Sequence, residues 1–455
     1  MRAIAISVHF WIAIVLICSS FAASAASPNS RYLQLGQDRK VEPGVPVALL
    51  SMRIHAEKPS WLYVQSDGVY APTGETIANA YITINGKPVS NDSVTDWRGS
   101  RAPQPHAFNT IGAVRVEAGW VRVVLHGRSN GGGARFHAGS NLSAMLDPAR
   151  EVVVTQLARP SAWLDFDTRD TPEGEPLPRS GYRHALAHRA GTSGGMVVAM
   201  ASGRSYAATS PGDAMWGIFL DGKQPPTWRM TWSINDLFRE GAETQAAMFS
   251  HAVLEMPKGG GEVSLVTSES PYYQPKMAST NGVKYRVGTG ARLITLSGGM
   301  RVAGSARAAP RYYKANGLNS RYSYICLGTN GFNPRKCPPL GGNVVLGKSR
   351  VCVPRGHNGV VLFASKTRIQ GDQHDPGGDV SLRLRINGKY VGSTGYQSLG
   401  PLPHSVSTRT LSTSYLAAGT SALAPGCHDV EAVGFAKGNF RNISMNADMP
   451  LLWFD

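Results

Sequence analysis

The sequence predicts an all-β protein made of three tandem antiparallel β-sandwich modules, of jelly-roll or Ig-like type, with one short helix in the second module. Two observations support this fold class. A strand that ends in Asn-Gly-Lys or Asp-Gly-Lys occurs three times along the 455 residues. The chain also holds 51 glycines and 29 prolines, and its apolar segments alternate with period two, which is typical of short strands joined by turns.

The repeated unit is clearest in the range 382–391. Leucine and isoleucine alternate there with arginine and asparagine, which is the period of a strand with one buried face. The pair Asn387-Gly388 then predicts a tight turn with positive φ, after which the apolar run resumes. The ranges 82–89 and 218–223 repeat this unit.

Three further features surround each unit in the same order. A Pro-Gly turn with a carboxylate precedes it, an apolar strand that ends in serine and then arginine lies further upstream, and an alternating strand with a glycine turn follows. The same order in three places indicates a module that is present three times. A chain of this length can supply about three domains of roughly 130–150 residues, each with its own core.

Residues 1–26 have the form of a secretory signal peptide. Arg2 supplies the basic start, an apolar segment runs to Cys18, and Ala23-Ser24-Ala25 forms a small-residue cleavage site. We expect cleavage there, and an uncleaved anchor is the alternative. No later apolar stretch approaches about 18 residues, so we expect no transmembrane segment in the mature chain. The chain is predicted to be exported to the periplasm, the cell surface or the medium.

The predicted modules span residues 27–167, 168–309 and 310–455. The range 165–179 holds Asp, Glu, Gly and Pro without periodicity, which predicts a linker between the first two modules. In the second module, Ser233 is expected to cap a helix over Ile234–Glu240. In the third, the spacing between repeats indicates an insertion that includes the range 311–342 and is rich in tyrosine and arginine.

All cysteines after the signal lie in the third module: Cys326, Cys337, Cys352 and Cys427. Four cysteines in an exported chain predict two disulfides, with three possible pairings. We expect Cys326 to pair with Cys337 inside the insertion, and Cys352 to pair with Cys427 between an early and a late strand. The alternative is a zinc site with histidines of the same module, namely His357, His374 and His428, although their spacing fits no compact zinc motif.

Positive charge is concentrated in the third module. Basic and acidic side chains number 14 and 12 in the first module, 15 and 11 in the second, and 16 and 7 in the third. A basic surface on an exported protein is typical of binding to acidic polysaccharide, lipopolysaccharide phosphate or anionic lipid. A high pI that only keeps the protein soluble is the other interpretation. Nucleic acid is not a predicted partner, because the chain has an export signal and no recognisable binding motif.

The candidate ligand-binding residues are basic and aromatic side chains of the third module: Tyr312, Tyr313, Tyr322, Tyr324, Arg383 and Arg385. A tyrosine ring offers the apolar face and the hydroxyl group that stack on and hydrogen-bond a sugar. Packing of the tyrosines within a sheet is the alternative. The two arginines alternate with buried positions, so both guanidinium groups should leave one sheet face, where they can bind carboxylate or phosphate.

The most polar cluster contains Asp372, His374, Asp375 and Asp379. Oxygen ligands at this density can hold calcium, and Asp372, Asp375 and Asp379 are the candidate ligands. A solvated turn is the alternative, because the other two copies of this turn carry only Glu75 or Asp213. No other cofactor is predicted.

No catalytic residues are predicted. The range 191–195 matches the nucleophile-elbow pattern around Ser193, but a strand is expected after it where the elbow needs a helix. His184 and His188 have the spacing of two metal ligands on a helix, but no acidic third ligand is near. A solvated pair is the simpler interpretation.

The sequence therefore predicts an exported, non-enzymatic binding protein of the cell envelope or extracellular space that recognises a glycan or an anionic surface. Two other classes stay open. One is a structural subunit of a surface appendage, whose modules would join by strand addition. The other is a polysaccharide-active hydrolase with carboxylates brought together from distant loops.

Overall fold

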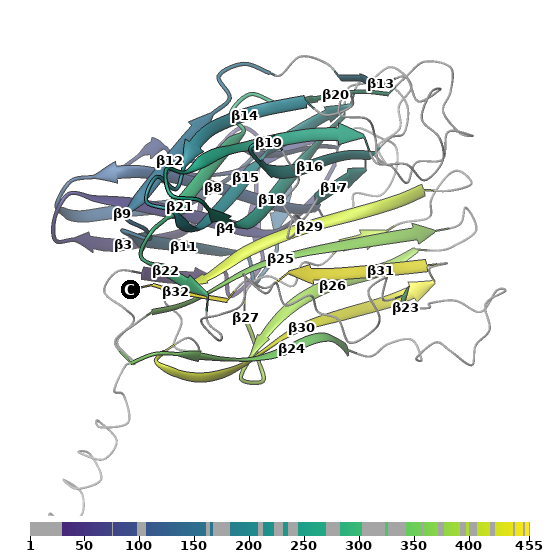
Figure 1. The fold of residues 1–455 in the computed structure, drawn as a ribbon. Helices are drawn as coiled ribbons and strands as arrows, with labels where there is room; N and C mark the ends of the chain where they lie inside the picture. Colours follow the sequence, from purple (N-terminus) through teal and green to yellow (C-terminus); the bar gives the residue numbers. More distant parts are fainter. Residues whose placement is uncertain are drawn as a thin grey trace, which may run out of the picture.

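The chain folds into antiparallel β-sheets, as a computed structural model shows (Figure 1). The structure describes residues 30–74, 76–97, 106–160, 164–166, 183–207, 213–222, 231–234, 244–269, 283–302, 324–325, 343–355, 358–371, 377–391, 397–399, 407–418, 424–439, 442–448 and 451–454. Every pair of strands in this part of the chain is antiparallel, and it contains no helix. The predicted all-β class is confirmed. The signal segment 1–26 lies outside the described residues.

The first unit comprises β1 to β11 in two sheets. The larger has the order β1-β11-β4-β10-β2 with β8 beside β4, and the smaller has the order β3-β9-β5-β6 with β7 beside β5. The strands are β1 (Ser30–Gln34), β2 (Arg39–Val41), β3 (Val47–Ala56), β4 (Ser60–Pro72), β5 (Thr76–Ile84), β6 (Lys87–Pro88), β7 (Ser93–Trp97), β8 (His106–Val116), β9 (Gly119–Gly131), β10 (Ala134–Phe136) and β11 (Asn141–Leu146).

The second unit comprises β12 to β21. Its sheets have the orders β12-β21-β15-β20-β13, with β18 beside β15, and β14-β19-β16-β17. The strands are β12 (Glu151–Gln156), β13 (Leu164–Phe166), β14 (Arg183–Ala190), β15 (Gly195–Ala207), β16 (Asp213–Leu220), β17 (Thr231–Ile234), β18 (Thr244–Met256), β19 (Gly261–Glu269), β20 (Val283–Val287) and β21 (Arg292–Ser297).

The third unit comprises β22 to β32. Its sheets have the orders β22-β32-β25-β31-β23, with β29 beside β25, and β24-β30-β26-β27, with β28 beside β26. The strands are β22 (Met300–Val302), β23 (Tyr324–Ile325), β24 (Asn343–Val353), β25 (Asn358–Gly371), β26 (Gly377–Ile386), β27 (Lys389–Val391), β28 (Gln397–Leu399), β29 (Ser407–Ala418), β30 (Gly426–Asn439), β31 (Asn442–Asp448) and β32 (Leu451–Phe454).

The same strand connections occur in each unit. In every larger sheet the first strand of the unit pairs with a late strand that also pairs with a long central strand: β1-β11-β4, β12-β21-β15 and β22-β32-β25. The smaller sheets repeat the order β3-β9-β5, β14-β19-β16 and β24-β30-β26. Strand pairing places the ranges 151–156 and 300–302 in the second and third units. The sheets therefore change earlier along the chain than the predicted boundaries at 167/168 and 309/310.

The prediction of a helix that starts at Ser233 in the second unit is wrong at its first residues, which form a strand. Ser233 and Ile234 belong to β17, which pairs with β16 opposite Ala214 and Asp213. The alternation of large side chains in Thr-Trp-Ser-Ile favours this pairing over a helix cap. Residues 235–240 of the predicted helix lie outside the described part.

The predicted linker 165–179 begins inside β13, which pairs with β20. The remainder of the linker, from residue 167, lies outside the described residues.

The repeated Asn/Asp-Gly turn has one conformation in all three units. Asn85, Asp221 and Asn387 have φ values of 49°, 49° and 50°, and the glycine after each also has positive φ. Asparagine and aspartate tolerate this left-handed region better than other non-glycine residues, which explains their place before glycine.

A pair of hydrogen bonds fixes each of these turns to the neighbouring strand. The turn residue donates its backbone N–H to a carbonyl oxygen of that strand, and its Oδ1 accepts the N–H of the same strand residue. The strand residues are Arg122 for Asn85 (2.9 and 2.9 Å), Glu262 for Asp221 (2.8 and 2.8 Å) and Asp429 for Asn387 (2.8 and 2.9 Å). Arg122, Glu262 and Asp429 are therefore equivalent positions.

Buried side chains fill the space between the two sheets of the first unit and of the second. In the first unit the rings of Tyr70, Phe108 and Phe136 lie 5.4 to 6.0 Å apart, among aliphatic side chains from both sheets. In the second unit Trp216 is fully buried in the corresponding core. Gly203 makes room for it, since a Cβ there would lie 3.0 Å from the indole and 2.6 Å from Ala291.

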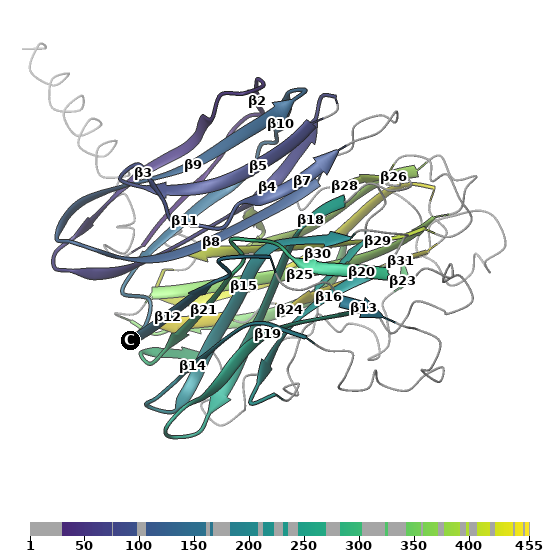
Figure 2. The ribbon, with the colours of Figure 1, turned by 90° about the horizontal axis from the view of Figure 1, so that it is seen from above.

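A separate apolar cluster joins the first unit to the second. Tyr63 and Met145 from the first larger sheet pack with Met200, Phe249 and other apolar side chains of the second. The Tyr63 hydroxyl lies 3.0 Å from the sulfur of Met200 and donates to Gln65 Oε1 at 2.8 Å. The outer faces of the two larger sheets are thus a shared core, and the purple-blue and teal strands lie against each other in Figure 2.

Strands of all three units contact one another. The equivalent strands β8, β18 and β29 each contact the other two, and β29 also contacts β4 and β11 of the first unit. In Figure 1, β29 runs beside both earlier units. The part of the chain that the structure describes contains no helix long and apolar enough to cross a lipid bilayer.

Candidate functional site

The candidate site lies on the outer face of the smaller sheet of the third unit. On β26, Leu384 and Ile386 are fully buried, whereas Arg383 and Arg385 are half-buried on the opposite face. The predicted alternation is confirmed for these four residues, and both guanidinium groups leave the same face of the sheet.

Tyr390 lies between the two arginines. The two-residue turn at Asn387-Gly388 returns the chain along β27 and sets Tyr390 directly opposite Arg385. The guanidinium carbons of Arg383 and Arg385 lie 5.3 and 5.9 Å from the centre of its ring. A guanidinium at this distance gains about 0.5–1 kcal/mol from the ring at an exposed site. The tyrosine remains 42% exposed.

Acidic side chains from β30 neutralise part of this charge. Arg385 Nε lies 2.5 Å from Glu431 Oε2, and Lys348 Nζ lies 3.5 Å from Glu431 Oε1 and 3.4 Å from Asp429 Oδ2. The guanidinium of Arg385 is therefore held in place by Glu431 and Tyr390, which limits it as a free fork for a ligand. Arg383 and Tyr390 lie next to the ion pair between Arg385 and Glu431.

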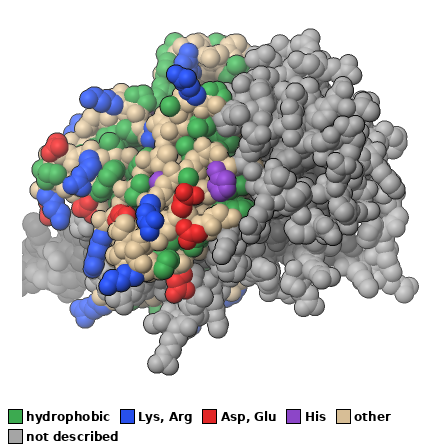
Figure 3. All heavy atoms as spheres, turned by 45° about the horizontal axis from the view of Figure 1, so that its top comes forward, with side chains coloured by type: hydrophobic (Ala, Val, Ile, Leu, Met, Phe, Trp, Pro, Cys, Tyr) green, Lys and Arg blue, Asp and Glu red, His purple; other side chains and the backbone are tan. Residues whose placement is uncertain are grey.

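On one face of the described part of the protein, basic side chains are dispersed (Figure 3). On the face drawn in Figure 3, the described Lys and Arg side chains are spread among apolar and polar ones and do not merge into one continuous patch. Recognition of a charged ligand on this face would therefore depend on particular clusters of side chains.

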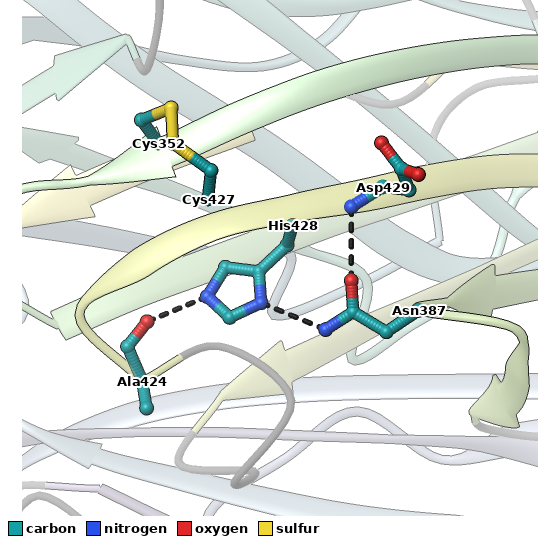
Figure 4. Close-up of a disulfide and its surroundings, with 6 residues drawn as sticks. All are labelled: Cys352, Asn387, Ala424, Cys427, His428 and Asp429. Carbon is teal, nitrogen blue, oxygen red and sulfur yellow. Dashed lines mark hydrogen bonds between the residues drawn. A yellow bond between two sulfur atoms is a disulfide. The ribbon is translucent and has the colours of Figure 1, made fainter.

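The turn below the site is fixed by a chain of hydrogen bonds (Figure 4). His428 Nε2 lies 2.6 Å from the carbonyl oxygen of Ala424, and Nδ1 lies 2.9 Å from the side-chain nitrogen of Asn387. A carbonyl oxygen can only accept, so Nε2 donates and Nδ1 accepts from the amide. Both ring nitrogens are thus occupied, which leaves none for the predicted zinc alternative. His357 and His374 lie outside the described residues.

One of the two predicted disulfides is confirmed. Cys352 and Cys427 stand directly opposite each other on β24 and β30 and are joined through their sulfur atoms, next to His428 (Figure 4). Their bond fixes the end of this sheet. Cys326 and Cys337 lie outside the described part of the chain.

The structure places the one predicted tyrosine that it describes, Tyr324, in a different sheet from the two predicted arginines. Tyr324 begins β23 and pairs opposite Ser444, in the larger sheet of the third unit, whereas Arg383 and Arg385 lie in the smaller one. The other three, Tyr312, Tyr313 and Tyr322, lie outside the described residues. Sequence reasoning missed Tyr390 and Glu431. The two-residue turn was a usable signal for Tyr390, because it fixes which residue faces Arg385.

The predicted calcium ligands are only partly described. Asp379 belongs to β26, where it pairs opposite Lys437 and Ser398, so it occupies a strand position and not a loop. Asp372 and Asp375 lie outside the described residues. Within the described ranges, no group of three His, Cys, Asp or Glu side chains is arranged to hold a metal ion.

The two patterns that resemble catalytic or metal motifs in the second unit are structural. Ser193 lies in an exposed turn in which Gly194 donates to the carbonyl oxygen of Gly191, and β15 follows it as a strand, as expected. His184 and His188 lie on β14 and not on a helix. His188 is not solvated as expected: its ring nitrogens lie 2.7 and 2.8 Å from the hydroxyls of Thr155 and Thr295.

His188 should make the stability of the second unit depend on pH. Burial lowers the pKa of His188 to about 4, with Glu151 acting weakly in the opposite direction. In the unfolded chain the ring takes up a proton near its usual pKa of 6.5, so the folded state is favoured above that pH and loses stability as pH falls toward 4. We expect a loss of about 1–3 kcal/mol across this window, measured by urea unfolding. The variant His188→Gln should flatten the profile, and an unchanged profile would contradict the prediction.

No protein-family model and no curated protein matches the sequence. Among solved structures, an Eiger TNF from S. frugiperda is 12% identical, with a TM-score of 0.21, and covers 27% of this chain and 99% of its own. A tandem CBM22 domain from Paenibacillus barcinonensis is 12% identical, with a TM-score of 0.15, over 58% of this chain and 93% of its own. A β-porphyranase of glycoside hydrolase family 86 from Bacteroides plebeius is 13% identical, with a TM-score of 0.17, and the match covers 54% of this chain and 30% of the porphyranase. None of these likenesses is close enough to assign a function.

Proposed function

We propose that this chain is an exported, non-enzymatic binding protein, built of three tandem β-sandwich units, that recognises an acidic glycan or another anionic component of the cell envelope or extracellular space. The observation that carries the proposal is that Arg383 and Arg385 lie on one sheet face against the ring of Tyr390, with Arg385 also paired to Glu431. Export rests on the signal-like segment 1–26.

The arrangement combines the two kinds of group that an acidic sugar needs. A guanidinium group binds a carboxylate or sulfate through two parallel N–H donors, and its position is already fixed by the ring below it. The exposed part of Tyr390 offers an apolar surface and a hydroxyl beside the charges. The excess of 16 basic over 7 acidic side chains in the third module adds a field that attracts anions.

The test is a titration of the full mature protein with an oligogalacturonate of defined length. Replacement of Arg383 and Arg385 by alanine should weaken binding several-fold at low salt, and the difference should shrink at high salt because exposed charges are screened. The variant Arg31→Ala with Arg135→Ala removes the same charge from exposed positions of the first unit and serves as the matched control. Equal binding by both variants would refute the assignment to this face, and release of shorter sugars would show that the protein is a polysaccharide-cleaving enzyme.

A further inference from the structure

The smaller sheet of the first unit carries a second cluster of basic and aromatic side chains on its outer face. Arg53 and His55 on β3, and Trp120 and Arg122 on β9, are all exposed, while the residues between them on each strand are buried in the core. Arg53 stands directly opposite Arg122, and His55 stands directly opposite Trp120.

The other two units show what this position normally holds. Arg122, Glu262 and Asp429 are equivalent, because each makes the same two hydrogen bonds with the repeated turn. The residues directly opposite them are Arg53, Arg189 and Arg350. The second and third units therefore set an arginine opposite a carboxylate, whereas the first unit sets an arginine opposite another arginine.

Two like charges directly opposite each other on neighbouring strands destabilise a sheet. Within the described part of the chain, neither Arg53 nor Arg122 makes an ion pair with a carboxylate, and Arg122 Nε donates to Ser51 Oγ at 3.4 Å. This bond directs the guanidinium of Arg122 toward β3, on the same side as Arg53. An anion held between the two arginines would supply the charge that the other units carry as Glu262 and Asp429.

The aromatic pair beside the arginines adds an exposed ring. Trp120 is 64% exposed, and the ring of His55 meets it edge-on with centres 5.0 Å apart. An exposed indole supported by a neighbouring ring can pack against the apolar face of a sugar. The equivalent position of the third unit holds the disulfide Cys352–Cys427, so the aromatic pair is a feature of the first unit and not of the repeat.

We propose that this face is a second glycan site, in which Arg53 and Arg122 bind the carboxylate of a uronic acid residue and Trp120 packs on the ring of the same or the next sugar. The occupant is an acidic polysaccharide. A sugar acid has both the anionic group and the flat apolar face that the cluster presents. An anion without an apolar face would use the arginines and leave Trp120 without a contact.

The variant Arg122→Glu tests this site, because it introduces a carboxylate of the kind that the other two units have at the equivalent position. It gives the first unit the arrangement that Arg189 and Glu262 have in the second unit, so the fold should be retained and Tm should stay the same or rise by about 1–3 °C. Titration with oligogalacturonate should show two sites per wild-type chain and one in the variant. Trp120→Ala should weaken the first-unit site by roughly 3–10-fold.

The two sites are separated by combining variants. Arg122→Glu in the Arg383→Ala, Arg385→Ala background should abolish measurable binding, and each alone should leave one site. A wild-type chain with a single site, which Arg122→Glu abolishes and which Arg383→Ala, Arg385→Ala leaves unchanged, would refute only the proposed function above. Unchanged stoichiometry and affinity in Arg122→Glu would overturn the present inference. So would equal binding of the methyl-esterified oligogalacturonide, or binding to vesicles of anionic phospholipid that Trp120→Ala leaves unaffected.

Discussion

Replacement of Phe249 by alanine is expected to lower the free energy of unfolding by about 3–5 kcal/mol. Phe249 is 1% exposed and lies in the apolar cluster shared by the first and second units. Its removal leaves a cavity between two sheets whose backbones are fixed by their own ladders, so the surrounding side chains can close it only in part.

The variant Phe249→Ala also tests whether the first two units are stabilised together, through the set of strands that it destabilises. Because the cluster contains Tyr63 and Met145 of one unit and Met200 of the other, the variant should weaken both units together. Hydrogen exchange should show faster opening in β4 and β11 as well as in β15 and β18. Phe249→Leu, which keeps most of the volume, should lose much less. Faster exchange in the second unit alone would show that the units are independent.

Loss of the disulfide between Cys352 and Cys427 should have an effect of similar size on the third unit. The bond closes a segment with a sequence separation of 75 residues, and the chain-entropy relation gives roughly 4.5 kcal/mol for a loop of that length. Both cysteines are exposed, so reductant should reach the bond without prior unfolding.

The double variant Cys352→Ser, Cys427→Ser isolates this bond from the predicted Cys326–Cys337 pair, which mild reduction would also break. Guanidinium unfolding of the variant should show an earlier transition for the third unit. The first two units have no cysteine after the signal, and we expect their own sheets to be affected chiefly through the contacts with β29. Four free thiols in the wild-type protein, purified without reductant, would contradict the prediction.

The repeated turn could be predicted from the sequence because its cause is local. The left-handed conformation needs asparagine or aspartate followed by glycine, and the alternation before it needs only one buried face. The same reasoning predicts that the side chains of Arg383 and Arg385 lie on one face of the sheet. Glu431 could not be placed in this way, since it reaches Arg385 through the pairing of β26 with β30, which no short-range pattern encodes.

The contact between units was not predictable from period-two patterns. β4 is buried along almost its whole length on both faces, and it includes the polar residues Gln65, Ser66 and Asp67. A strand of this kind has no alternation to detect, and its polar residues are typical of a solvent-facing strand. The error at Ser233 has a related cause. A sequence with a helix-capping pattern can instead form a strand when a neighbouring strand is available for pairing, as β16 is here.

The mutual contacts of β8, β18 and β29 have a consequence for how the protein is made. β8 ends at Val116, and the strand that completes its surroundings begins only at Ser407. During synthesis the amino-terminal unit is therefore complete long before β29 can cover β4 and β8, and contacts so distant along the chain form slowly. Until then an unfinished sheet surface is open to other chains, which makes aggregation of the incomplete product the main hazard of its biogenesis.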